Sequence, residues 1–136
     1  MNTDSDVAAI KGVLEKYGAC CRGGDFDTWI SLWAERGVQM PPDSPAHVGV
    51  GDIRAAMEPA FGQTTLDLNV LSIDNAEIHG DLGLTRCTYS LRLVPKDGGE
   101  PIDAIPEGTA LTLYDRQADG AWKISYDCFN SNIAPE

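Results

Sequence analysis

Three side chains have the chemistry for proton transfer: Tyr17, His47 and Asp127. A tyrosine hydroxyl can donate a hydrogen bond to an oxygen that gains negative charge, as a carbonyl oxygen does when an enolate forms. Histidine titrates near neutral pH and suits general acid–base catalysis. A carboxyl group in an apolar pocket can be kept protonated or can act as a base. These residue types predict acid–base chemistry on a small molecule.

Tyr17 and His47 also have structural interpretations. Tyr17 lies on the apolar stripe of a predicted helix, so it can be a core tyrosine bonded to a backbone carbonyl. His47 lies in a short extended piece and can be an exposed histidine at a strand end. The sequence leaves both alternatives open.

Asp127 lies in the last predicted strand, beside Phe129. Strict alternation puts it on the face opposite Trp122, Ile124 and Tyr126. It is either a pocket carboxyl or the partner of an Arg or Lys on a neighbouring strand.

Several large apolar side chains are candidates for a pocket wall, although they can equally fill the core. They are Trp29, Trp33, Met57 and Phe61. Arg86 lies in the middle of a predicted strand, where a charge must be paired or solvated. It can hold a ligand carboxylate in the pocket or pair with an acid across an interface.

Composition limits the classes of partner. The 136 residues are 43% hydrophobic and carry a formal net charge of −11, which fits one globular domain over residues 1–136. So acidic a surface argues against nucleic acid as a partner. The polar N-terminus does not resemble a signal peptide, and no apolar run is long enough to cross a membrane. We therefore expect a cytoplasmic protein without a membrane partner.

The pattern of cysteines and histidines predicts neither metal nor cofactor. Cys20 and Cys21 are neighbours, a spacing that strains a disulfide, and the chain has no C-x-x-C motif. The carboxylates and the two histidines are scattered along the chain without ligand spacing. We expect reduced, mostly buried thiols.

The order of elements indicates an α+β fold. Apolar residues at steps of three and four predict a helix over 4–22, and shorter helices are predicted over 25–35 and 52–61. Strands are predicted over 38–40, 47–48, 65–78, 84–95, 102–116 and 122–130. A change of parity predicts a bulge near Val70 and Leu71, and Pro106 is a candidate break. Tight turns between the last four strands favour antiparallel pairing, so the fold class is three N-terminal helices on a bent, mostly antiparallel sheet.

Three segments in this order resemble the nuclear-transport-factor-two-like (NTF2-like) superfamily. They are YGACCRGGDFDTWISLWAERGVQMPPDSP, GVGDIRAAM and ADGAWKISYDCFNSN. The first two are similar to the opening and the third-helix entry of ketosteroid isomerases and SnoaL-like polyketide cyclases, and the last to their closing hairpin. The resemblance covers nearly the whole chain, is closest to uncharacterised bacterial members, and implies a cone-shaped domain. This fold hosts many functions, so the resemblance is less specific to activity.

The resemblance also bears on two site residues. It implies that Tyr17 matches the tyrosine that stabilises the enolate in ketosteroid isomerases. Met40 occupies the place of their catalytic aspartate, and a thioether cannot accept a proton at neutral pH. We therefore expect no steroid isomerisation by their route, and Met40 becomes a predicted ligand contact.

Three functional hypotheses remain. The first is a cofactor-independent isomerase or lyase that acts on a carbonyl or polyketide-like compound. The second is a non-catalytic module that binds a small apolar ligand, and the third is a structural dimerisation domain. Because the strands carry apolar residues on both faces, we also expect a homodimer.

Overall fold

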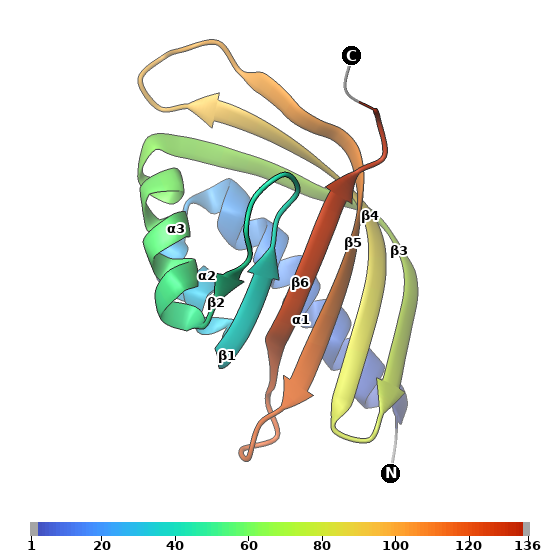
Figure 1. Ribbon diagram of the computed structural model, residues 1–136. Coiled ribbons are helices and arrows are strands. Elements are labelled where there is room, and N and C mark those ends of the chain that lie inside the picture. Colours follow the sequence, from blue (N-terminus) through green and yellow to red (C-terminus); the bar gives the residue numbers. More distant parts are fainter. Residues whose placement is uncertain (1–2, 135–136) are drawn as a thin grey trace.

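The computed structural model describes residues 3–134 and shows helices packed on one face of a curved sheet (Figure 1). The helices are α1 (Thr3–Gly23), α2 (Phe26–Ser31) and α3 (Val50–Gln63). The strands are β1 (Trp33–Met40), β2 (His47–Val48), β3 (Thr64–His79), β4 (Leu82–Pro95), β5 (Ile102–Arg116) and β6 (Trp122–Ser131). The predicted α+β class is confirmed. No helix among the described residues is long and apolar enough to span a membrane.

One six-stranded sheet runs in the order β2-β1-β6-β5-β4-β3. The pairing of β1 with β6 is parallel and all other pairings are antiparallel. Helix α1 contacts β3, β4 and β6, while α3 contacts β1, β2 and β3. The helices therefore cover the concave face of the sheet, and the convex face is left open (Figure 1).

The second helix is shorter than predicted. It ends at Ser31, and Trp33 already belongs to β1. Gly37 lies inside this strand rather than at a helix end. A Cβ atom there would lie 2.9 Å from the Trp33 ring and 3.2 Å from the Ile124 carbonyl oxygen, so only glycine allows β1 to lie this close to β6.

Bulges decide which side chains face the helices. The predicted bulge in β3 is confirmed, because the register with β4 shifts between Val70 and Ser72 and leaves Leu71 exposed. Strand β5 continues through Pro106, but its register with β4 shifts there, because Tyr89 pairs with Gly108 and Leu91 with Ile105.

The bulge that matters most was not predicted. In β6, Ile124 pairs with Tyr114 and Tyr126 pairs with Leu113, so Ser125 is an extra residue. Trp122, Ile124 and Asp127 are all buried, whereas Tyr126 is 45% exposed. The expectation that Asp127 faces away from Trp122 and Ile124 was therefore wrong.

Candidate functional site

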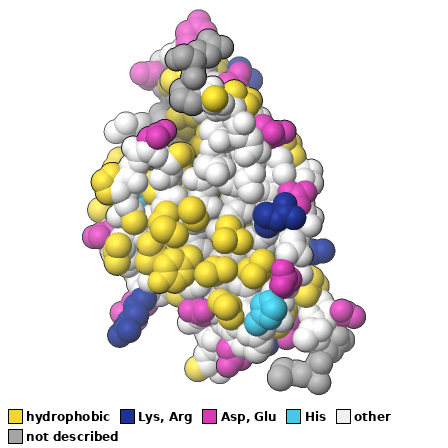
Figure 2. Space-filling model, turned by 45° about the vertical axis from the view of Figure 1, so that its right-hand side comes forward, with side chains coloured by type: hydrophobic (Ala, Val, Ile, Leu, Met, Phe, Trp, Pro, Cys, Tyr) yellow, Lys and Arg dark blue, Asp and Glu magenta, His cyan; other side chains and the backbone are white. Residues whose placement is uncertain are grey.

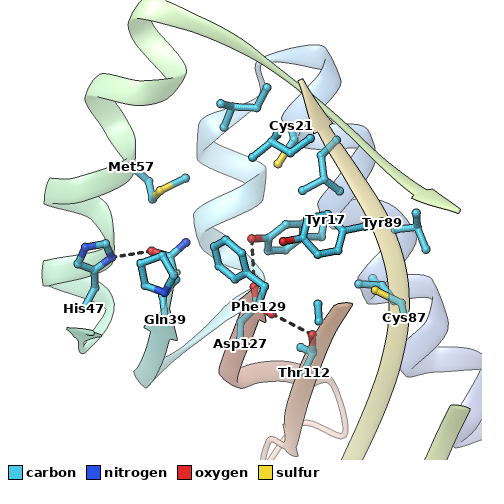
Figure 3. Close-up of a pocket in the computed structure, with 17 residues that line it drawn as sticks. Tyr17, Cys21, Gln39, His47, Met57, Cys87, Tyr89, Thr112, Asp127 and Phe129 are labelled. Atoms are coloured by element: carbon cyan, nitrogen blue, oxygen red, sulfur yellow. Dashed lines mark hydrogen bonds between the residues drawn. The ribbon is translucent and has the colours of Figure 1, made fainter. Parts of the chain in front are cut away.

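A cavity of about 210 Å³ lies between the helices and the concave face of the sheet. We call it the central cavity, and Figure 3 shows its lining. Its apolar wall comes from α1, α3 and the strands β3 to β6, with a proline from the end of β1. The apolar residues are Leu14, Pro41, Met57, Leu66, Leu68, Val70, Leu91, Ala110 and Phe129. Its polar or ionisable residues are Tyr17, Cys21, Gln39, His47, Cys87, Tyr89, Thr112 and Asp127.

Helix α1 supplies Leu14, Tyr17 and Cys21 because residues spaced by three and four share one face of a helix. The sheet supplies a row of polar residues by register. His47 pairs with Gln39, Gln39 with Asp127, and Asp127 with Thr112, so the row crosses β2, β1, β6 and β5. Helix α1 and this row of polar residues therefore both border the central cavity, from opposite sides.

Asp127 is the centre of the polar contacts. Its side chain is buried, Tyr17 donates to its Oδ2 atom at 3.1 Å, and Thr112 donates to its Oδ1 atom at 3.0 Å. Burial raises the pKa of Asp127 to about 6, against the lowering effect of the hydrogen bonds from Thr112 and Tyr17. Among residues 3–134 no Lys or Arg side chain lines the cavity, and Asp127 forms no ion pair.

The other acidic groups of the cavity stay protonated at neutral pH. Burial, with the negative charge of Asp127, raises the pKa of Tyr17 well above its usual value. Burial is also the first cause that raises the pKa of Cys21 and of Cys87 to about 12. Tyr17 is therefore a lasting hydrogen-bond donor, and these two thiols do not act as nucleophiles.

His47 stands at the α3 side of the cavity. Its Nδ1 atom lies 2.7 Å from the Oε1 atom of Gln39, and a dashed line joins the two residues in Figure 3. This contact holds the imidazole ring of a half-buried histidine in one orientation.

Four of the residues predicted from the sequence line the central cavity together. They are Tyr17, His47, Met57 and Asp127. The other five predicted contacts lie outside the lining: Trp29, Trp33, Met40, Phe61 and Arg86.

The aromatic residues among those five form the core. Trp29 is fully buried, and its ring contacts those of Tyr17, Trp33 and Phe61. Trp29 therefore supports Tyr17 from behind instead of forming the cavity wall.

Met40 and Arg86 belong to the other face of the sheet. Met40 pairs with the exposed Cys128, and its neighbour Gln39 occupies the cavity position of β1. Arg86 is half exposed, with its Nη1 atom 3.9 Å from the Oδ2 atom of Asp74. Neither is placed to contact a ligand in the central cavity.

Sequence reasoning missed Gln39, Thr112 and Tyr89. Thr112 and Tyr89 alternate with outward-facing residues in long strands, and the pairing register that places them appears only in the fold.

No group of His, Cys, Asp and Glu among the described residues could hold a metal ion.

Comparisons with known proteins agree with this architecture. The family model described as a SnoaL-like domain matches residues 3–126. A search of curated protein sequences gave no match. Among solved structures, a ketosteroid isomerase-like protein from Erwinia carotovora atroseptica is 23% identical, with a TM-score of 0.81 over 96% of this chain and 98% of that one.

Two further solved structures have the same fold. A proposed dehydratase of the NTF2-like family from Streptomyces avermitilis is 21% identical, with a TM-score of 0.83 over 98% of this chain and 100% of that one. An NTF2-like superfamily protein from Salmonella enterica is 13% identical, with a TM-score of 0.83 over 99% of this chain and 96% of that one. The chain therefore belongs to the SnoaL-like domain family, within the NTF2-like superfamily.

Proposed function

We propose that this protein is a cofactor-independent isomerase or lyase that uses acid–base chemistry on a small, largely apolar carbonyl compound. The observation that carries the proposal is Asp127: a carboxyl group buried in an apolar cavity, with Tyr17 and Thr112 each bonded to one of its oxygens. A general base works best with a pKa near the operating pH, and the pKa of Asp127, about 6, meets that condition.

The proposed step is a proton transfer. At neutral pH the Asp127 carboxylate takes a proton from the carbon beside the ligand's carbonyl group; the C–H electron pair moves toward the carbonyl oxygen and an enolate forms. In an isomerisation, Asp127 then returns the proton to another carbon of the enolate and the carbonyl group re-forms. In an elimination, the carbonyl group re-forms, a C=C bond forms as the bond between the next carbon and the leaving group breaks, and Asp127 gives the proton to the departing group. His47, on the far side of Gln39, is a second group able to give or take a proton at the leaving-group end.

Family membership supports the reaction class without naming the substrate. The relatives that share this fold include a ketosteroid isomerase-like protein and a proposed dehydratase. The apolar lining suits an apolar body. Within the described part of the chain no Lys or Arg lines the cavity, which disfavours a carboxylate ligand.

The test uses 2-indanone, a small neutral ketone, dissolved in D₂O. The protein is expected to accelerate the replacement of the ketone's α-hydrogens by deuterium, which proton NMR follows as loss of the CH₂ signal. The control is the same concentration of heat-denatured protein. Exchange no faster than in that control would contradict the proposed base catalysis.

The second candidate is a binding module without catalysis, which the mostly apolar wall of the cavity favours. The same NMR samples separate the two functions. A binding module shifts protein resonances when the ketone is added but leaves the exchange rate at the control value.

We also propose that the protein forms a homodimer through the convex face of the sheet. Figure 2 shows hydrophobic side chains gathered on this face. Register places them in adjacent rows across the strands; they are Val38, Val48, Leu84, Leu111, Leu113 and Tyr126. Leu111 and Tyr126 are each 45% exposed, and an open apolar sheet face of this kind favours a second copy of the chain.

Leu111→Asp is expected to convert the dimer to a monomer, because it places a charge on the convex face, two residues along β5 from Leu113. The matched control is Ile102→Asp, since Ile102 is 57% exposed but lies at the start of β5, where it pairs with Leu93 near the end of β4. Light scattering at tens of micromolar protein measures the mass. A monomer mass for the unmodified protein would contradict the proposed dimer, and the structural-domain hypothesis with it.

A further inference from the structure

Gln39 is a buried polar residue at the centre of the polar row. Its side chain is 1% exposed and lines the central cavity. By register it is the neighbour of His47 on one side and of Asp127 on the other. A buried amide in this position needs partners for both its oxygen and its nitrogen.

The amide oxygen already has its partner. Oε1 lies 2.7 Å from the Nδ1 atom of His47, which can donate to it. The Nε2 group therefore points the other way, into the cavity, as Figure 3 shows. The negative charge of Asp127 on the adjacent strand favours this orientation, because it attracts the amide hydrogens and repels the oxygen. Among the side-chain hydrogen bonds of residues 3–134, the Gln39 amide takes part only in the contact between its Oε1 atom and His47, which leaves the Nε2 group available to a ligand.

The other strong donors of the lining are occupied. While Asp127 is ionised, the hydroxyls of Tyr17 and Thr112 donate to its oxygens. The hydroxyl of Tyr89 donates to the backbone oxygen of Asn130 at 3.2 Å. Among the described residues of the lining, the Gln39 amide is therefore the strong donor left for a ligand oxygen, apart from the outer nitrogen of His47 when that ring is protonated.

We propose that the Nε2 group of Gln39 binds the carbonyl oxygen of the ligand. The ligand class is a neutral ketone, aldehyde or ester. Only the orientation of the ligand, with the carbon beside its carbonyl group toward Asp127, rests on the proposed function. With its oxygen on Gln39, the carbon beside the carbonyl faces Asp127. When Asp127 removes the proton, the oxygen gains negative charge, and the amide hydrogens stabilise it. His47 keeps the amide in this orientation and is a positioning residue in this respect.

The test compares two ligands of nearly the same shape, 2-indanone and indane, which differ by the carbonyl oxygen. Affinities are measured by NMR titration of the protein at about pH 8, where Asp127 is ionised and cannot donate. The protein is expected to bind 2-indanone about tenfold more tightly than indane, which is the size of effect one net hydrogen bond gives. In Gln39→Met, which keeps the length of the side chain and loses the donor, the preference is expected to disappear.

The matched control is Gln63→Met, because Gln63 is exposed at the end of α3. It is expected to keep the tenfold preference.

Should Gln39→Met fail to fold, the infrared carbonyl stretch of 2-indanone bound to the unmodified protein tests the same hydrogen bond. A stretch at lower frequency than in hexane supports the hydrogen bond, and a hexane-like stretch overturns it.

Equal affinity for the two ligands overturns the inference, as does a preference that persists in Gln39→Met. Equal affinity is also what the reverse amide orientation would give, because it places an oxygen in the cavity. These results leave Asp127 free to catalyse exchange, so they are distinct from failure of the proposed function. The converse result, a Gln39-dependent preference without any exchange, supports the inference and removes the catalysis.

Discussion

Asp127→Asn is expected to lower the rate of deuterium exchange into 2-indanone about 100-fold or more. The amide that replaces the carboxylate cannot accept the proton, and a general base contributes about 10²- to 10⁴-fold. The cavity, Tyr17 and Thr112 stay in place, so the ketone is still expected to bind. Proton NMR in D₂O measures both the exchange rate and the binding.

The control is Asp115→Asn, because Asp115 is an exposed aspartate on β5 outside the cavity lining. It is expected to exchange at the rate of the unmodified protein. A rate in Asp127→Asn within a factor of about two of the unmodified protein would show that another group is the base.

Tyr17→Phe is the companion variant and separates positioning from proton transfer. The hydrogen bond from Tyr17 lowers the pKa of Asp127, so its loss is expected to raise that pKa. The midpoint of the exchange rate against pH is then expected to move to higher pH, while exchange itself persists. A purely structural role for Tyr17 would leave the midpoint unchanged.

The stability of the fold is expected to fall as the pH rises, through the contribution of Asp127. The pKa of Asp127 is about 6 in the folded protein, and its ordinary value, which applies to the unfolded chain, is 3.8. Between these two pH values the folded state therefore holds a proton that the unfolded state has lost. The stabilisation is complete below the ordinary pKa and is lost as the pH rises through the folded one. Two pKa units correspond to about 3 kcal/mol in the free energy of unfolding.

Urea unfolding at about pH 4 and about pH 8 measures this effect. The unmodified protein is expected to lose about 2 to 3 kcal/mol relative to Asp127→Asn between these conditions. The difference between the two proteins removes the contributions of other acids, among them Asp6 and Asp74, whose lowered pKa values act in the opposite direction. If the two proteins differed in unfolding free energy by the same amount at both pH values, burial would not raise the pKa of Asp127.

The sequence predicted the helical side of the site well. Helical periodicity is regular, so the apolar stripe that carries Leu14 and Cys21 also indicated the face on which Tyr17 lies. The helix–strand boundary after Ser31 was less clear, because an aromatic residue such as Trp33 fits an apolar helix face and a buried strand equally well.

The strand side could not be predicted to the same degree. Period-two alternation fails wherever a bulge adds a residue, and Ser125 carries no sequence signal that marks it as one. Gln39 shows a second difficulty. A polar residue between Val38 and Met40 normally faces solvent, yet here the cavity is on its side and the apolar neighbours lie on the open convex face. Here the polar side chain of a strand is buried and its apolar neighbours face outward, which is the reverse of the usual pattern.

The most direct test of the central claim is a carbon-13 NMR titration of the Asp127 side-chain carboxyl group, assigned by comparison with Asp127→Asn. The claim is that burial in the central cavity holds this carboxyl group ready for proton transfer near neutral pH. The expected result is a pKa of about 6 for Asp127. A pKa at or below the ordinary value of 3.8 would contradict the claim, because so weak a base is poorly matched to proton abstraction at neutral pH.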